Sequence, residues 1–331
     1  MKTLSQIAKE LGVSRAAVSY VYNNKWREQR INEALAAKIM EKIKVEGCVP
    51  DQLGKQLRTG RTNTIGVLLT DLERYFNLEL LGGIQKKLTE TDYLMLLGNS
   101  YFGKKEYSFF SRMLSRKVDG IIFCPSGKSD EVTSLLKNDK PQMVFLDNYL
   151  PEFKDIPYIA TDSYAASSMI VEHCASCGCR KMAWIGGHEK NAIINDRLQG
   201  FLKAMKERNL KVDKQLISRG RSTTEAIETV FSQGTPDALI FDSLVYIDIA
   251  LDILKEKKML NGMKVRITGF DRPSLSGAFK EITGAIPYVK QDTELMGSTA
   301  AQILIDMISG KVPEKKEYLI NAEFITPGKE K

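Results

Sequence analysis

The chain has 331 residues, of which 43% are hydrophobic and 27% are charged, and its formal net charge is +7 at pH 7. This length exceeds one ordinary hydrophobic core and predicts two or three domains. No apolar run reaches the length that a membrane helix needs, and the first residues lack the apolar segment of a secretory signal. We therefore expect a globular cytoplasmic protein and exclude the membrane-spanning classes.

The excess positive charge is concentrated at the start of the chain. Residues 1–61 contain 12 Lys and Arg against 6 Asp and Glu, so the other 270 residues carry a net charge of only +1. A basic segment attached to a nearly neutral body is typical of a nucleic-acid-binding module. Chance clustering of charge is the alternative.

Two short helices are predicted in this basic segment. Thr3 and Gln6 fit the capping-box pattern, apolar residues then follow at helical spacing, and Gly12 suits the left-handed position that ends a helix. Ser14 is a good N-cap for a second helix that starts at Arg15. Two short helices joined by a tight turn are typical of a helix-turn-helix, whose second helix enters the DNA major groove.

The predicted second helix has two unlike faces. Its inner face is apolar, with Ala17, Val18, Val21 and Tyr22. Its outer face carries Arg15, Ala16, Ser19, Tyr20 and Asn23. The outer face offers hydrogen-bonding groups to a DNA groove, and the alternative is a solvated face on a small helical bundle. The charge asymmetry favours DNA.

Two stretches resemble the LacI/GalR family of bacterial transcription regulators, namely TLSQIAKELGVSRAAVSYVYNN and EGCVPDQLGKQLRTGRTNTIGVLLTD. The A-x-x-L-G-V-S-x-x-x-V-S core is specific for the DNA-binding headpiece of that family. The resemblance runs from Thr3 to about Thr326. It implies a headpiece at 1–47, a hinge segment at 48–63, and an effector-binding and dimerisation domain at 64–331.

The resemblance also implies roles in DNA binding. In the family, a hinge leucine wedges between base pairs in the minor groove, and Leu57 occupies that position. Tyr20 stands where many members carry an arginine, and tyrosine cannot make the bidentate contact of arginine to guanine, so the operator should differ. The implied base-reading residues are Arg15, Ala16, Tyr20 and Leu57. The implied contacts to the DNA backbone come from Thr3, Ser14, Ser19, Asn23 and Lys55.

From residue 64 onward, short apolar runs alternate with helical patterns, which predicts parallel strands covered by helices on both faces. The fold class is therefore a small all-α headpiece followed by a doubly wound α/β domain. The resemblance implies a two-lobe, periplasmic-binding-protein-like domain, with one lobe at about 64–162 plus 292–325 and the other at about 163–291. Ligands in such sheets bind outside the carboxyl ends of the strands.

The resemblance carries eight candidate effector-binding residues onto this chain: Asp71, Phe76, Asn77, Asp162, Arg197, Ser243, Asp271 and Gln291. Arg197 has the fork that suits hydroxyls or carboxylates, although it can instead bridge the lobes. Ser243 stands where most relatives have Asn; it can substitute weakly, or Asp242 can take over. An Asp at a strand end, such as Asp71 or Asp162, is equally suited to cap a helix.

The segment HCASCGC, from His173 to Cys179, has the residue types of a metal site. No second Cys-x-x-Cys completes such a site, so we expect Cys174 and Cys177 to be buried as small hydrophobic residues and predict no metal and no cofactor. The chain also lacks a Walker loop, a G-x-S-x-G motif and a paired-acid signature, which argues against an enzyme.

These features predict a sequence-specific DNA-binding transcriptional regulator, and more specifically a repressor. We expect a homodimer on a pseudopalindromic operator, with no membrane partner. The expected effector is a sugar or sugar derivative bound between the lobes, and a nucleoside, a purine or a protein co-regulator is the alternative. A sugar-binding transport receptor is a further alternative, because the α/β fold alone permits it.

Overall fold

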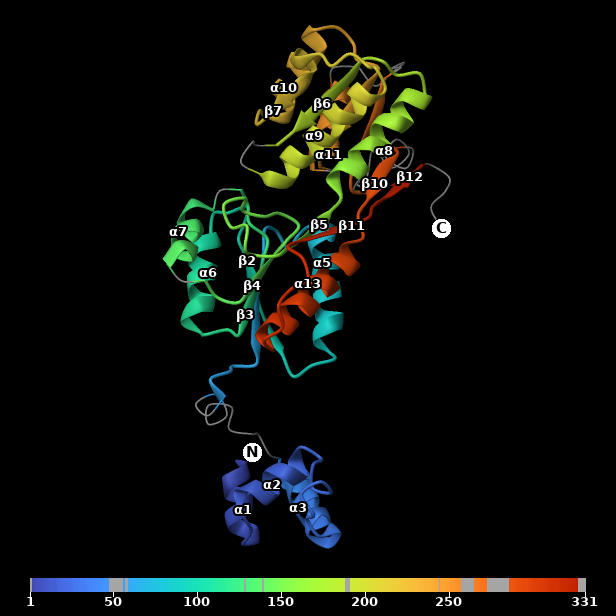
Figure 1. Cartoon of the computed structure of the whole chain (residues 1–331). Coiled ribbons are helices and arrows are strands. Elements are labelled where there is room, and N and C mark those ends of the chain that lie inside the picture. The colour runs from blue at the N-terminus through green and yellow to red at the C-terminus, as the bar shows by residue number, and fades with distance from the viewer. Residues whose placement is uncertain are drawn as a thin grey trace. The chain divides into compact units, whose positions relative to one another are not determined.

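The computed structural model describes residues 2–47, 56, 59–127, 129–138, 140–187, 191–243, 245–256, 265–272 and 286–326. The chain divides into two compact units between Thr62 and Asn63. The first unit is helical, and the second contains two parallel sheets with helices on both faces (Figure 1). Within the described residues, no helix combines the length and the apolar character that crossing a bilayer requires.

The first unit contains α1 (Leu4–Leu11), α2 (Arg15–Tyr22) and α3 (Glu33–Glu46). The predicted capping box of α1 is confirmed, because the Thr3 hydroxyl oxygen accepts from the backbone N–H of Gln6 at 3.3 Å and the Gln6 amide oxygen accepts from the backbone N–H of Thr3 at 2.8 Å. Gly12 ends α1 with φ at 64°. Ser14 caps α2 by accepting from the N–H of Ala17 at 3.1 Å.

A small apolar core holds these three helices together, with Ile7, Val18, Val21, Trp26 and Ile39 all buried. Burial of such side chains stabilises a unit too short to form a larger core. The prediction for the inner face of α2 is confirmed at Val18 and Val21. It is wrong for Tyr22, the last residue of α2, which is exposed although Val21 beside it is buried, so the core contacts the last turn of α2 only on the side of Val21.

The first sheet of the second unit has the strand order β11-β5-β4-β3-β1-β2, and all its strands are parallel. This sheet and its helices are called the first lobe. Its elements are β1 (Thr64–Leu69), α5 (Tyr75–Leu88), β2 (Leu94–Asn99), α6 (Glu106–Ser115), β3 (Gly120–Phe123), α7 (Asp130–Asn138), β4 (Met143–Leu146), β5 (Tyr158–Thr161), α13 (Thr293–Ile308) and β11 (Glu317–Ile320).

The second sheet has the order β12-β10-β9-β8-β6-β7, and among these described strands only β12 is antiparallel to its neighbour. This sheet and its helices are called the second lobe. Its elements are α8 (Ser163–Ser176), β6 (Met182–Gly186), α9 (Ala192–Glu207), the 3-10 helix η1 (Lys214–Leu216), β7 (Ile217–Arg219), α10 (Thr223–Ser232), β8 (Ala238–Phe241), α11 (Val245–Glu256), β9 (Arg266–Phe270), β10 (Tyr288–Lys290) and β12 (Glu323–Ile325).

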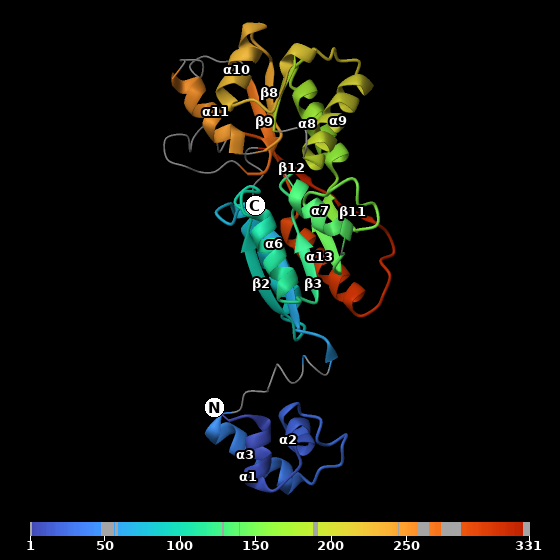
Figure 2. The ribbon, with the colours of Figure 1, turned by 90° about the vertical axis from the view of Figure 1, so that its left-hand side faces the viewer.

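Each sheet is buried on both faces, as continuous apolar strands require. In the first lobe, α5 and α13 pack on one face and α6 and α7 on the other. In the second lobe, α8 and α9 cover one face and α10 and α11 the other (Figure 2). The side chains of β1 show the alternation, because Val67 points to α5 and α13 while Leu68 points to α6 and α7.

Within the part of the chain that the structure describes, three crossings join the lobes, after β5, after β10 and after β11. The assignment of residues 292–325 to the first lobe is therefore wrong at its end. β11 pairs with β5 in the first sheet, but β12 pairs with β10 in the second sheet, with Phe324 opposite Val289. Two adjacent short strands can pair with either sheet edge, and the apolar pattern alone does not distinguish the edges.

Candidate functional site

The outer face of α2 is a solvent-facing surface. Arg15, Ala16 and Tyr20 are exposed, with 37% of the surface of Tyr20 accessible, whereas Val18 behind them is fully buried. The capped start of α2 fixes the orientation of this face. The structure thus brings the three predicted base readers of α2 onto one exposed face, as their helical spacing requires.

The side chains predicted to contact the DNA backbone lie at the two helix starts and beside α2. Thr3 and Ser14 are the N-caps of α1 and α2, where backbone N–H groups favour an anion such as phosphate. The Asn23 amide donates to the Ser19 carbonyl oxygen at 2.8 Å. Leu57 and Lys55 lie outside the described residues.

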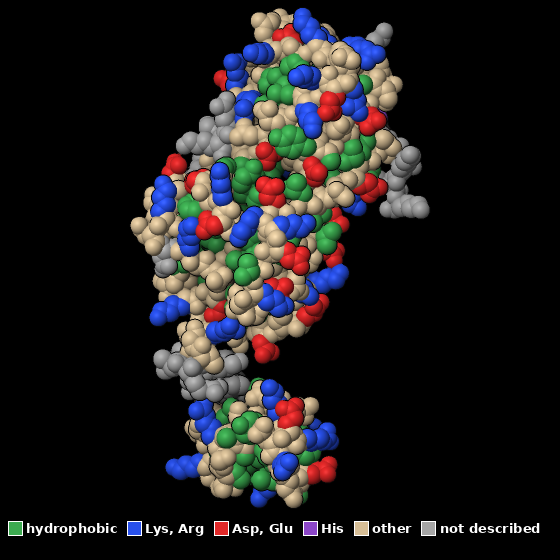
Figure 3. Space-filling model, viewed as in Figure 1, with side chains coloured by type: hydrophobic (Ala, Val, Ile, Leu, Met, Phe, Trp, Pro, Cys, Tyr) green, Lys and Arg blue, Asp and Glu red, His purple; other side chains and the backbone are tan. Residues whose placement is uncertain are grey.

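Some basic groups of the first unit are already paired with acids. Lys42 contacts Glu10 at 2.9 Å and Glu46 at 2.6 Å, and Lys2 pairs with the same two acids. The bonds to these carboxylates raise the pKa of both lysines. This network neutralises charge away from α2. Other Lys and Arg side chains lie around the visible face of the first unit (Figure 3).

A second cluster lies where the carboxyl ends of the strands of both lobes meet. Gln291, which follows β10, accepts from the Thr161 hydroxyl at 2.5 Å and donates to an Asp271 oxygen at 2.5 Å. Arg197 of α9 donates to the Gln291 amide oxygen at 3.2 Å and to the Asp242 carbonyl oxygen at 2.6 Å. The structure thus joins three predicted effector residues, Arg197, Asp271 and Gln291, in one hydrogen-bonded cluster.

Arg197 acts electrostatically on three buried carboxyl groups, those of Asp147, Asp242 and Asp271. Burial raises the pKa of Asp147 to about 6, while Arg197 opposes the rise and Asp271 adds to it. Burial also raises the pKa of Asp242 to about 6, against the effects of the Gly187 N–H and Arg197. Burial raises the pKa of Asp271 as well. Buried acids with raised pKa values are typical of functional sites.

Sequence reasoning missed Asp147, and it mentioned Asp242 only as a substitute for Ser243. Asp147 follows β4 directly, and its carboxylate lies 3.9 Å from the thiol sulfur of Cys124 at the end of β3. The sequence did contain a signal for Asp147. This acid ends the apolar run MVFLD in the same way that Asp71 ends the apolar run TIGVLLTD. Ser243 is half-buried, while Asp242 beside it is fully buried.

The remaining predicted effector residues have clear local roles. Asp71 accepts from the Glu73 N–H at 3.1 Å and pairs with Arg74 at 3.2 Å, and the Asn77 amide donates to the Asp71 carbonyl oxygen at 2.6 Å. Phe76 packs against the apolar core of the first lobe. Asp162 caps α8 by accepting from the N–H of Ala165 at 2.9 Å, which is the helix-capping role that we gave as the alternative to ligand binding.

The two lobes also touch through the loop after β4. The Asn148 side-chain oxygen accepts from the N–H of Ile193, in the first turn of α9, at 3.3 Å. The Tyr149 hydroxyl donates to Asp196 of the same helix at 3.0 Å, and its ring stacks on Tyr158 with centroids 4.2 Å apart. The first lobe therefore holds the start of the helix that carries Arg197.

The cysteine-rich segment ends α8 beside the second core. Cys174 is buried among apolar side chains, as predicted for a small hydrophobic residue, and Cys179 is buried with it. The same prediction is wrong for Cys177, which is half-buried because it lies at the C-cap of α8, where the helix ends. The sulfur of Cys177 lies 3.9 Å from Nε2 of His173. Among the described residues, no three His, Cys, Asp or Glu side chains are grouped to hold a metal ion.

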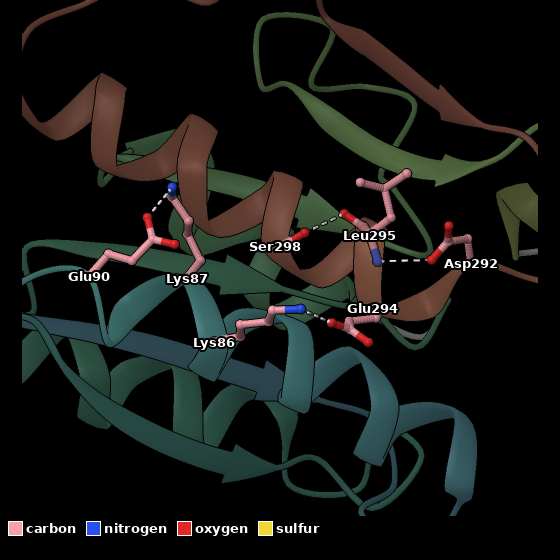
Figure 4. A pocket seen from close by; sticks show the side chains of 7 residues that line it. All are labelled: Lys86, Lys87, Glu90, Asp292, Glu294, Leu295 and Ser298. Atoms are coloured by element: carbon pink, nitrogen blue, oxygen red, sulfur yellow. Dashed lines mark hydrogen bonds and ion pairs between the residues drawn. The ribbon is translucent and has the colours of Figure 1, made fainter.

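A shallow pocket on the outer side of the first lobe lies between α5 and α13 (Figure 4). Lys86 pairs with Glu294 at 2.6 Å and Lys87 with Glu90 at 2.6 Å, while Asp292 caps α13 through the N–H of Leu295 at 3.0 Å. The charged groups in this pocket bind one another, as is common for ion pairs at an exposed helix–helix contact.

A helix-turn-helix unit followed by a two-lobe α/β unit, with polar groups gathered at the strand ends of both lobes, defines the class of DNA-binding regulators with a periplasmic-binding-protein-like core. Residues 62–326 match the family model described as periplasmic binding proteins and sugar binding domain of LacI family. The chain therefore belongs to the LacI family.

Individual relatives agree over nearly the whole chain. The HTH-type transcriptional regulator RegA of Clostridium saccharobutylicum is 29% identical, with 98% of this chain and 97% of RegA covered. The repressor CytR of Escherichia coli K12 is 25% identical, with 98% and 95% covered. These relatives are transcriptional regulators, not enzymes.

Two solved structures share the fold. The lac repressor dimer bound to operator and the anti-inducer ONPF matches with a TM-score of 0.78 and 18% identity, over 98% of both chains. The complex of the transcriptional regulator CelR with cellobiose matches with a TM-score of 0.70 and 22% identity, over 98% of this chain and 99% of CelR. At these identities the likeness establishes the fold.

Proposed function

We propose that this protein is a transcriptional repressor that binds a pseudopalindromic operator as a homodimer and responds to a small molecule held between its two lobes. The observation that carries the proposal is the capped helix α2, whose exposed face bears Arg15, Ala16 and Tyr20 on a compact basic unit. The site is formed by short-range capping and packing, so it is already folded before it meets DNA.

Each side chain on α2 has a distinct part in this proposal. Arg15 in the first turn reaches a base edge or a phosphate, since helices of this motif enter the major groove with their N-terminal end. Tyr20 offers one hydroxyl and an aromatic edge, and Ala16 allows close approach. Thr3 and Ser14 place the starts of α1 and α2 against phosphates. Residues 48–63 act as the hinge, with Lys55 on the backbone and Leu57 in the minor groove.

The proposed dimer uses the exposed edge of the first sheet. β2 is the terminal strand of that sheet, and Leu94 at its start is 72% exposed. Met95, Leu96 and Leu97 are only half-buried although they lie in a strand. An apolar edge strand is a favourable surface for a second copy of the chain. A dimer carries two α2 helices, one for each half-site of the operator.

The effector is proposed to lie between the lobes, against the cluster of Arg197, Asp242, Asp271, Gln291 and Asp147. A ligand that contacts groups from both lobes stabilises one arrangement of the lobes and so shifts the population of DNA-binding states. A sugar derivative is the first candidate. A nucleoside or purine is the second candidate. Since its operator is chromosomal DNA, the proposed location is the cytoplasm.

The test is selection of DNA from a random duplex library by the full chain and by a variant that begins at Asn63. The full chain should enrich a site with two inverted half-sites, and its affinity should fall steeply with salt. The shortened variant, which retains the second unit, should enrich nothing. Equal enrichment by both proteins would contradict the proposal.

A further inference from the structure

The connection between α2 and α3 carries a concentration of exposed positive charge. Residues 24–30, called the basic loop, contain three cations, Lys25, Arg27 and Arg30, against one acid, Glu28. All four charged side chains are exposed. Among the residues that the structure describes, none of the three cations forms an ion pair, whereas other lysines of the first unit are bound to acids. The charge of this loop is therefore available to a partner.

The basic loop has a fixed shape. The Gln29 N–H donates to the Lys25 carbonyl oxygen at 3.2 Å, and the Ile31 N–H donates to the Trp26 carbonyl oxygen at 2.9 Å. The side chain of Trp26 is buried in the core of the first unit. Arg30 has a φ of 53°, which is uncommon for a residue other than glycine and is held here by these bonds. The loop thus presents its cations in one arrangement.

Arg27 is held more closely than an ordinary exposed arginine. Its guanidinium carbon lies 4.6 Å from the centre of the Trp26 ring. Stacking on an aromatic face restricts the side chain but leaves the N–H groups at the edge of the guanidinium available. This planar fork of donors matches the oxygens of a phosphate. Arg27 is therefore a preorganised phosphate donor.

The basic loop begins where α2 ends. The Lys25 N–H donates to the carbonyl oxygen of Tyr20 at 2.8 Å, so the loop starts beside a predicted base reader. The helix has 8 residues and is about 12 Å long. This length is close to the width of the DNA major groove, which is about 12 Å. A helix of this length in the groove brings the residues at its ends to the phosphates that border the groove.

We propose that the basic loop is a second DNA contact, in which Lys25, Arg27 and Arg30 bind backbone phosphates and supply affinity without sequence preference. This inference rests on the proposed function, in which α2 lies in the major groove. Arg15 is the one cation in the sequence of α2. Since neutralised phosphates supply much of the affinity for DNA, cations beside the helix add what its own face lacks.

The experiment measures the salt dependence of DNA binding by the full chain. It uses two duplexes, one with the site selected from the random library and one of unrelated sequence. The loop variant combines Lys25→Gln, Arg27→Gln and Arg30→Asn; it retains Trp26, and asparagine tolerates the positive φ at position 30. Loss of three phosphate contacts should lower the slope of log K against log salt by about 2–3, equally for both duplexes. The selected sequence should stay the same.

The control variant removes the same charge from other parts of the first unit. Lys9, Lys38 and Lys44 are exposed on α1 and α3, and the control replaces all three with glutamine. It has the net charge of the loop variant but an intact basic loop, so its slope should change less than half as much. The inference is overturned if both variants lower the slope equally, or if the loop variant binds DNA as the parent does.

The acid of the basic loop provides a readout of opposite sign. Glu28→Gln keeps every cation and removes a negative charge that repels nearby phosphates. Affinity for both duplexes should rise about two- to fivefold, the effect of one exposed charge pair. A variant that folded less well would lose affinity, so this gain cannot come from misfolding. Unchanged or weaker binding by Glu28→Gln would contradict the inference.

The outcomes also separate this inference from the proposed function. If the full chain selects a site with two inverted half-sites and the loop variant keeps the parent slope, the regulator stands and the loop contact fails. If the loop variant loses affinity for both duplexes but the full chain selects no inverted site, the loop contact stands and the proposed operator fails.

Discussion

Two adjacent glycines in α5 should respond oppositely to the same substitution. A Cβ on Gly83 would overlap the carbonyl oxygen of Glu294 in α13 and would lie 2.9 Å from its carbonyl carbon and 3.0 Å from its Cα. All three atoms belong to the backbone, so no rotamer change can relieve the overlap. A Cβ on Gly82 meets nothing within 4 Å.

The helix propensity of alanine and the cost of steric overlap decide whether each substitution raises or lowers the free energy of unfolding. Alanine in place of glycine in a helix gains about 1 kcal/mol of stability, which is all that Gly82→Ala should show. Overpacking against rigid neighbours costs about 1–3 kcal/mol, and an overlap with backbone belongs at the upper end. Gly83→Ala should therefore lower the free energy of unfolding by about 2 kcal/mol, after the helical gain is subtracted.

The assay is thermal and chemical denaturation of the two variants beside the parent protein. For a unit of this size, a loss of about 2 kcal/mol lowers the melting temperature by about 4–8 °C. Gly82→Ala should melt at or above the parent temperature. The reasoning is refuted if Gly83→Ala is as stable as Gly82→Ala, since close contact between α5 and α13 would then not require glycine.

Three further outcomes follow from the structure. Arg15→Ala should reduce operator affinity and lower the slope of log K against log salt by about 1, whereas Arg116→Ala in the second unit should not. Burial raises the pKa of Asp147 from 3.8 to about 6. The folded state therefore binds the proton more tightly than the unfolded state, and the resulting stabilisation is present below pH 4 and lost as the pH rises to 6. In denaturation curves, Asp147→Asn should reduce this decrease in the free energy of unfolding between pH 4 and 6. Tyr149→Phe removes the bond to Asp196 and should cost about 1 kcal/mol of unfolding free energy, while Tyr107→Phe, at an exposed ring, should cost almost nothing.

The first unit could be predicted in detail because its signals are local. The Thr3–Gln6 box, Gly12 and Ser14 act within one or two helical turns, and each has the expected partner or backbone angle. Tyr22 was predicted to lie on the inner face of α2 but is exposed. The helical pattern does not identify the neighbours on which the burial of this side chain depends. The alternation of apolar runs and helical patterns was also enough to predict two parallel sheets.

The site between the lobes was predictable only in part, because its residues meet through tertiary structure. Arg197, Asp271 and Gln291 came from family resemblance and lie together. Asp147 was missed because a strand-end acid has the same appearance in sequence whether it caps a helix, as Asp162 does, or lies beside an arginine. The exchange of β12 into the second sheet depends on edge pairing, which the residues of the strand do not encode by themselves.

The most direct test of the central claim, that α2 reads the operator, compares the DNA sites selected by the parent protein and by Tyr20→Arg. Arginine can bond two guanine atoms at once, and tyrosine cannot. The account predicts that the variant gains a preference for guanine at one position in each half-site, in symmetric places, with the rest of the site unchanged. Identical selected sites for both proteins would contradict it, because Tyr20 would then not face a base.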